Sequence, residues 1–89
     1  MLAETDSSIK STIYIPLLEE GTVVFRPTQG VALDTSIFRV LPTDDYDPED
    51  EVWKFPPGAV VRCEKQKRDG EEILIAVSEH SVIPARRLR

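Results

Sequence analysis

The sequence contains very few of the residues that build nucleophilic and metal sites. It has one cysteine, Cys63, and one histidine, His80, among 89 residues. A single cysteine cannot form an internal disulfide, so the chain is no disulfide scaffold, and this favours a reducing compartment. One cysteine and one histidine also cannot fill the four positions of a structural zinc site. A nucleophilic pair of the two would lack a third group to orient the histidine, so we expect no catalysis of that kind.

Long apolar runs and clustered glycines are missing as well. No stretch approaches the roughly 18 apolar residues of a membrane span. Residues 1–11 have neither the basic segment nor the apolar run of a secretory signal. The four glycines are scattered, so no glycine-rich loop is available to cradle a phosphate. We therefore expect a cytoplasmic protein that is not an enzyme and holds no cofactor.

Basic residues are scarce in the first two thirds of the chain. Residues 1–61 hold 11 acidic and 4 basic residues, whereas residues 62–89 hold 5 acidic and 7 basic ones, and the net charge is −5. Broad nucleic-acid binding needs a basic surface that contacts phosphates. The acidic balance argues against it for the chain as a whole, but leaves it open for the C-terminal part.

Short apolar alternations between turn residues indicate an all-β fold. No window of 11 residues follows the helical period. Strands are expected at residues 11–17, 22–33, 37–41, 52–55, 59–66 and 72–79. Asp69-Gly70 predicts a tight hairpin between the last two. Pro27 and Gly30 predict a bulge or a sharp bend within the second.

Five to six antiparallel strands in so short a chain favour a single small SH3-like barrel, because closure removes exposed strand edges. The expected barrel spans residues 11–79, with a flexible N-terminal tail at 1–10 and a basic C-terminal tail at 80–89. Alternation also predicts which residues are largely buried. They are Ile13, Ile15, Val23, Phe25, Phe38, Val40, Val61, Cys63, Ile75 and Val77.

Two segments carry distinctive motifs. Residues 14–27 combine a tyrosine-proline-leucine strand, a Glu-Gly turn and an aromatic-Arg-Pro bend, and residues 50–58 place an acidic run before Trp-x-Phe. As a set these motifs resemble those of a family of small uncharacterised bacterial proteins. The resemblance extends over residues 13–77, with Phe25 standing where the family has tryptophan. It implies a bacterial source and an SH3-like β-barrel, and it implies no activity.

Residues 43–51, Thr-Asp-Asp-Tyr-Asp-Pro-Glu-Asp-Glu, carry six carboxylates and no base. Their spacing resembles the start of a calcium loop, but Asp50 and Pro56 occupy the positions that would need glycine and a bidentate glutamate, so no metal is expected. Two interpretations are then left: a solvated loop between strands, and a surface that contacts a basic protein partner. The predicted contact residues are Asp44, Asp45, Tyr46, Asp47, Glu49, Asp50, Glu51, Trp53 and Phe55.

The two aromatic residues that follow the acidic run, Trp53 and Phe55, have a second interpretation. A small core needs large side chains, so they could fill the barrel instead of lining its surface. Our functional hypothesis is a non-enzymatic interaction or accessory domain that uses the 43–55 region. The alternative is a nucleic-acid-associated barrel that uses the basic 62–68 hairpin and the C-terminal tail. Its bases would be Arg62, Lys65, Lys67, Arg68, Arg86, Arg87 and Arg89.

Overall fold

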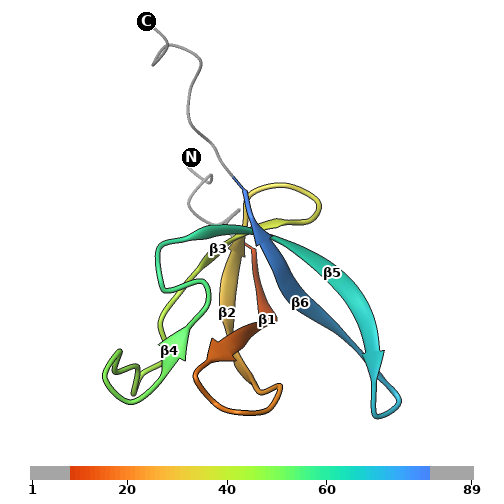
Figure 1. Cartoon of the computed structure of the whole chain (residues 1–89). Coiled ribbons are helices and arrows are strands. Elements are labelled where there is room, and N and C mark those ends of the chain that lie inside the picture. The colour runs from red at the N-terminus through yellow and green to blue at the C-terminus, as the bar shows by residue number, and fades with distance from the viewer. Residues whose placement is uncertain (1–8, 81–89) are drawn as a thin grey trace, which may run out of the picture.

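Six strands and no helix make up residues 9–80, which are the part of the chain that the computed structural model describes (Figure 1). The all-β prediction is therefore confirmed. Most of both predicted tails, residues 1–8 and 81–89, lies outside the described residues. The strands are β1 (Lys10–Leu18), β2 (Phe25–Ala32), β3 (Ile37–Val40), β4 (Val52–Trp53), β5 (Val60–Arg68) and β6 (Glu71–Glu79).

The strand pairings form a closed circuit. β1 pairs with β2, β2 with β3, β3 with β5, β5 with β6, and β6 returns to β1. The first four pairings are antiparallel, whereas the β1–β6 pairing is parallel and consists of the bridge Tyr14↔Ile75. The expectation of antiparallel strands throughout is wrong at this step. Direction alternates along antiparallel neighbours, so a circuit with an odd number of strands must contain a parallel pair.

β4 lies outside this circuit and extends the sheet from β1. Leu17 pairs with Trp53 and Leu18 with Val52, and the Lys54 N–H donates to the Pro16 carbonyl at 2.9 Å. The predicted strand at 52–55 is shorter than expected, because the chain bends after its second residue. This pairing attaches the segment that follows the acidic residues to the end of β1.

β2 passes through Pro27 and Gly30 without the predicted bulge. Residues 25–31 pair in continuous register with residues 10–16 of β1. Proline has no backbone N–H to donate to a neighbouring strand. Pro27 is tolerated because β2 pairs with β3 only over residues 30–32, and Pro27 lies outside that ladder. Gly30 is required for another reason: a Cβ there would lie 2.8 Å from Ile13 Cδ1 and 3.1 Å from Phe38 Cβ. The glycine allows the strand to approach the core closely.

The turn between β5 and β6 has the predicted Asp-Gly geometry. Asp69 and Gly70 have φ values of 52° and 84°, and two central residues with positive φ match the right-handed twist of the flanking strands. β3 pairs with β5 only at residues 60–62 of β5, and β1 pairs with β6 only at Ile75 of β6. The distal part of the hairpin, residues 64–74, therefore projects past both neighbouring strands (Figure 1).

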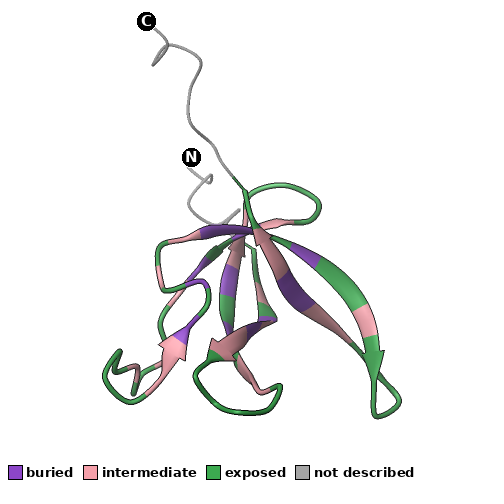
Figure 2. Ribbon diagram, in the orientation of Figure 1, coloured by how far each residue is buried: buried purple, intermediate pink, exposed green. Residues whose placement is uncertain are grey.

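The core draws on every strand of the circuit: buried residues alternate along β1, β2 and β3, and adjacent pairs are buried in β5 and β6 (Figure 2). Seven of the ten residues predicted to be buried are buried, whereas Val23 is 78% exposed and Phe25 and Val77 are half-buried. Val23 was misplaced because β2 begins only at Phe25, which leaves Val23 in the connecting loop. The buried residues that the prediction omitted are Thr28, Gly30, Trp53, Phe55, Val60 and Ala76.

Candidate functional site

The acidic segment forms an ordered loop between β3 and β4, at the same end of the molecule as the β1–β2 loop (Figure 1). Asp47 organises it: its Oδ1 accepts the Glu49 N–H at 2.9 Å, and its carbonyl accepts the N–H groups of Asp50 and Glu51 at 2.9 and 3.1 Å. Asp45 Oδ1 also accepts the hydroxyl of a nearby threonine at 2.9 Å. Hydrogen bonds in which an aspartate carboxylate accepts from a neighbouring backbone N–H are typical of tight turns.

Glu51 attaches the end of this loop to strands β2 and β4. Its Oε1 accepts from Arg26 Nε at 3.0 Å and from Trp53 Nε1 at 3.1 Å, and its Oε2 pairs with the other arm of the same guanidinium. A two-pronged guanidinium–carboxylate pair is geometrically specific. The hydrogen bond from Arg26 holds the pKa of Glu51 below its ordinary value, with a further contribution from Trp53. Hydrogen bonding to Glu51 in turn raises the pKa of Arg26.

This attachment predicts how stability depends on pH. The folded-state pKa of Glu51 lies below its unfolded value, so the stabilisation is present above about pH 4.3 and is lost as the pH falls through the folded-state pKa. At neutral pH we expect Glu51→Gln to lower the free energy of unfolding by roughly 0.5–1 kcal/mol, as for other partly exposed ion pairs. Urea unfolding of both proteins should show this gap closing on acidification. Glu49→Gln, on the exposed part of the loop, is the control, and a gap that persists unchanged in acid would contradict the assignment.

Three of the predicted aspartates converge on one small pocket. Asp45, Asp47 and Asp50 line it together with Glu51 and Arg26, and its volume is about 180 Å³. Since Glu51 neutralises the Arg26 guanidinium, the three aspartates leave the pocket with a net negative charge. Small-molecule sites usually enclose roughly 300–1,000 Å³. This pocket is therefore suited to the cationic head group of a single side chain.

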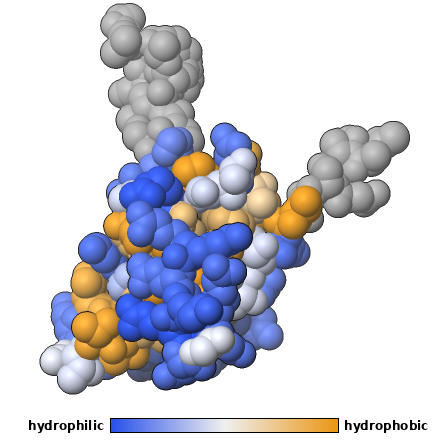
Figure 3. All heavy atoms as spheres, turned by 90° about the vertical axis from the view of Figure 1, so that its right-hand side faces the viewer, coloured by the Kyte–Doolittle hydropathy of each residue, from blue (hydrophilic) through white to orange (hydrophobic). Residues whose placement is uncertain are grey.

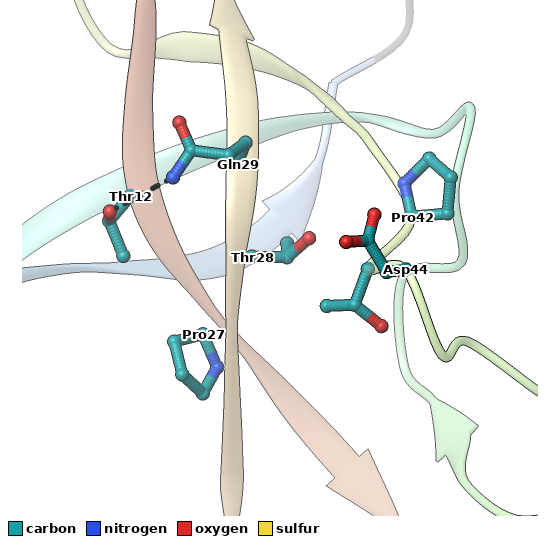
Figure 4. Close-up of a pocket in the computed structure, with 7 residues that line it drawn as sticks. Thr12, Pro27, Thr28, Gln29, Pro42 and Asp44 are labelled. Carbon is teal, nitrogen blue, oxygen red and sulfur yellow. Dashed lines mark hydrogen bonds between the residues drawn. The ribbon is translucent and has the colours of Figure 1, made fainter.

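The other predicted contact residues lie elsewhere. Asp44 borders a different groove, whose floor is the outer face of β1 and β2 (Figure 4). Glu49 is exposed on the loop and does not line the acidic pocket, although its backbone N–H donates to Asp47. Tyr46 packs edge-on against Trp53, with ring centroids 4.7 Å apart.

The groove of Figure 4 is more open than the acidic pocket, and Asp44 is the one charged side chain among the residues that line it. Thr28 points into the gap between β2 and the loop, where its hydroxyl donates to the Leu41 carbonyl at 2.7 Å, and Gln29 donates to Thr12 across the strand pair at 3.1 Å (Figure 4). These polar groups already have partners within the protein. The groove therefore offers a ligand little chemistry beyond Asp44.

Trp53 and Phe55 lie in the core, with exposures of 4% and 6%. This is the second of the two interpretations that the sequence leaves open for them. A partner could not reach either ring without unfolding the domain, so the predicted contact surface is reduced to the polar residues of the loop. The Trp53 indole still helps to position the loop, because its N–H donates a hydrogen bond to the Glu51 carboxylate.

Arg26 is the functional-site residue that sequence reasoning missed. It lies 25 residues before Glu51 and was noticed only as part of the aromatic-Arg-Pro motif. One signal was available, because Arg26 is one of only four bases in residues 1–61, which hold 11 acids, and a base in such an acidic segment often has a partner. Which acid it pairs with follows only from the approach of β2 to β4.

Cys63 has the properties of a core residue. It is 3% exposed, and burial raises the pKa of its thiol to about 11. A thiol with such a pKa is protonated at neutral pH and is a poor nucleophile. Within residues 9–80 there is also no group of three or more histidine, cysteine or acidic side chains placed to hold a metal ion.

Calcium should accordingly have no effect on stability. We expect millimolar calcium to change the melting temperature by less than about one degree, because a ligand stabilises a fold only in proportion to its occupancy of the native state. Differential scanning fluorimetry with calcium and with magnesium would measure this. A clear rise with calcium that disappears in Asp45→Asn and Asp47→Asn would show that the loop binds the ion.

The basic hairpin that supports the nucleic-acid alternative also carries acids close to its bases. Arg62 forms an ion pair with Glu64 at 3.0 Å, and the guanidinium of Arg68 lies over the Phe25 ring at 5.1 Å. Lys67 and Arg68 of β5 stand opposite Glu72 and Glu71 of β6. The hairpin surface is hydrophilic (Figure 3), but neither β5 nor β6 contains an aromatic residue on which a base could stack. The three tail arginines lie outside the described residues.

A scan against models of protein families, a search of curated proteins and a search of solved structures each found no match to this chain. The resemblance to a bacterial family therefore stays a prediction. Within residues 9–80, no helix has the length and apolar character needed to cross a membrane.

Proposed function

We propose that this protein is a small SH3-like barrel that acts as a non-enzymatic interaction or accessory domain, and that it binds a basic protein partner through the acidic loop. The closed circuit of five strands supports the barrel class. The observation that carries the functional proposal is the convergence of Asp45, Asp47 and Asp50 on one pocket. A solvated loop would not need to direct its carboxylates to one point.

The loop is held in place before any partner arrives. Glu51 attaches it to Arg26 and Trp53, and Tyr46 packs its middle against the core. Preorganised groups lose little conformational freedom on binding, which improves affinity. The negative field of the loop would also accelerate encounters with a basic partner, and this acceleration would fall as salt rises.

Charge reversal within the loop tests the proposal. The probe is a fluorescent peptide of alternating lysine and serine, and binding is measured by anisotropy at low and at moderate salt. We expect Asp45→Lys combined with Asp50→Lys to weaken binding by at least about tenfold, because the pocket then repels the lysine head group. Binding of the unmodified protein should fall as salt is added.

The matched control combines Asp44→Lys with Glu49→Lys, which changes the net charge equally on the same loop but outside the pocket. It should have the smaller effect, and both variants should unfold within roughly 0.5 kcal/mol per substitution of the original protein. Equal effects of the two variants would mean that only net charge matters. Binding of a single-stranded oligonucleotide that is lost on neutralising Arg62, Lys65 and Lys67 would favour the nucleic-acid alternative instead.

A further inference from the structure

The outer edge of β5 has no neighbouring strand beyond the end of β3. β3 pairs with β5 as far as Arg62, and one further backbone hydrogen bond follows, from the Cys63 N–H to the Ser36 carbonyl at 2.9 Å. Backbone groups alternate sides along an antiparallel ladder. The N–H and C=O groups of Lys65 and Lys67 therefore point to the same side as the Cys63 N–H, and in the described part of the chain no strand pairs with them there.

A groove of about 520 Å³ lies beside this edge, at the point where β3 ends. Its lining consists of Thr35 and Ser36, which precede β3, residues 62–65 of β5, and Leu74 of β6. A strand that continued the line of β3 past its end, antiparallel to β5, would lie in this groove (Figure 1). Because a two-stranded ribbon alone is marginally stable in water, a third strand at this position would also stabilise the projecting hairpin.

The charges along this edge indicate which kind of segment fits it. Glu64 is engaged by Arg62 at 3.0 Å, whereas neither Lys65 nor Lys67 forms an ion pair with a described residue. Lys65 stands opposite an apolar residue of β6, and Glu72, opposite Lys67, offsets part of one charge only. The edge therefore keeps an excess of positive charge, which a carboxylate complements.

The two lysines also determine which strand is kept away. Their side chains share one face of β5, the face on which Cys63 is buried, because side chains alternate along a strand. Lysine on an edge strand discourages pairing with a second copy of the same edge, since like charges would stand side by side. An extended segment with carboxylates at alternate positions meets no such repulsion and places a carboxylate beside each ammonium.

We propose that the outer edge of β5 binds an extended acidic segment of a partner protein, which pairs with Lys65 and Lys67 through its backbone and through carboxylates at alternate positions. In strand addition of this kind, main-chain hydrogen bonds supply affinity and side chains supply specificity. This surface does not involve the acidic pocket, so the inference stands or falls independently of the proposed function.

Peptides with identical side chains and different backbones test the strand pairing. The probe is a fluorescent peptide that alternates glutamate with valine, and its anisotropy is measured against the full-length protein. Residues directly opposite Lys65 and Lys67 place their side chains beside the lysines and their N–H groups toward β5, and these are the glutamates. N-methylation of the glutamates should weaken binding by about tenfold, as expected for losing two hydrogen bonds, whereas N-methylation of the valines should change it by less than about twofold. Equal affinities of the two methylated peptides would show that charge alone attracts the peptide, and would overturn the strand addition.

Charge reversal on the protein tests the role of the lysines. Lys65→Glu with Lys67→Glu should weaken binding of the unmethylated peptide by at least about tenfold, because like charges then face its glutamates. The matched control, Lys10→Glu with Arg39→Glu, changes the net charge equally at exposed positions outside the groove and should have the smaller effect. Urea unfolding verifies that both variants fold. Equal effects of the two variants would contradict recognition by the β5 edge.

Amide hydrogen exchange places the bound peptide on the unmodified protein. Exchange of the Lys65 and Lys67 N–H groups should slow when the peptide is added, whereas that of Gln66, whose N–H already faces β6, should not change. Unchanged exchange at both lysines would overturn the inference. A single-stranded oligonucleotide that displaces the peptide at a lower concentration would make nucleic acid the occupant, and an oligomer of the protein that the peptide dissociates would make it a second copy. Either result would overturn the proposed partner.

Discussion

Replacing Phe38 with alanine is expected to leave the protein largely unfolded at room temperature. Phe38 is 4% exposed, belongs to the central cluster and lies against the backbone of Gly30. Truncating a buried phenylalanine typically costs about 3–5 kcal/mol. Small domains have total stabilities near the lower end of the usual range of about 5–15 kcal/mol. Urea unfolding followed by tryptophan fluorescence would measure the loss, since Trp53 is in the same cluster.

Phe25→Ala is the matched control for this experiment. Phe25 is the same residue type on a neighbouring strand, but it is only half-buried and its ring contacts Arg68 at the surface. We expect it to lower the free energy of unfolding by less than half as much, because less apolar area is lost from the interior. Similar losses for the two variants would show that Phe38 contributes no more than a partly exposed ring.

Gly30→Val is expected to destabilise the fold by about 1–3 kcal/mol, toward the upper end of that range. Strand propensity alone predicts the opposite sign, because valine is among the best strand formers and glycine among the poorest. Contacts within the folded core make valine unfavourable at this position. A Cβ at this position would meet Ile13 Cδ1 at 2.8 Å and Phe38 Cβ at 3.1 Å, and because Ile13 is fully buried, its methyl group would have to shift within the packed core.

Gln29→Val separates these two effects. Gln29 is the preceding residue of the same strand and is exposed on the outer face, so the added branched side chain meets no core atom. Its thermal melting temperature should stay the same or rise, while that of Gly30→Val should fall. A fall in both would indicate that β2 does not tolerate valine for reasons other than core packing.

Much of the secondary structure could be predicted from the sequence. The strand positions, the Asp69-Gly70 hairpin and most of the alternating core depend on local periodicity and turn chemistry, which act over a few residues. The burial prediction was wrong where it depended on the residue at which a strand begins. Val23 follows the alternation of the strand after it, but the strand begins two residues later, and Val23 is therefore exposed.

The candidate site could be predicted only in part. The carboxylates were visible as a run of acids, and four of them, Asp45, Asp47, Asp50 and Glu51, line one pocket in the structure. Neither their common pocket nor the role of Arg26 could be predicted, because both depend on how β2 approaches the loop from a distant part of the chain. Asp44 and Glu49 have the same chemistry but lie outside the pocket.

By itself the sequence determined an all-β chain with a tight hairpin, an acidic loop and too few cysteines and histidines for a disulfide or a zinc site. These properties follow from composition and from interactions between near neighbours. The tertiary structure decided that Trp53 and Phe55 are core residues, that Glu51 pairs with Arg26, and that one strand pair is parallel. The physical reason is that burial, ion pairing and sheet closure depend on segments far apart in sequence, and their energies exist only once those segments meet in the folded chain.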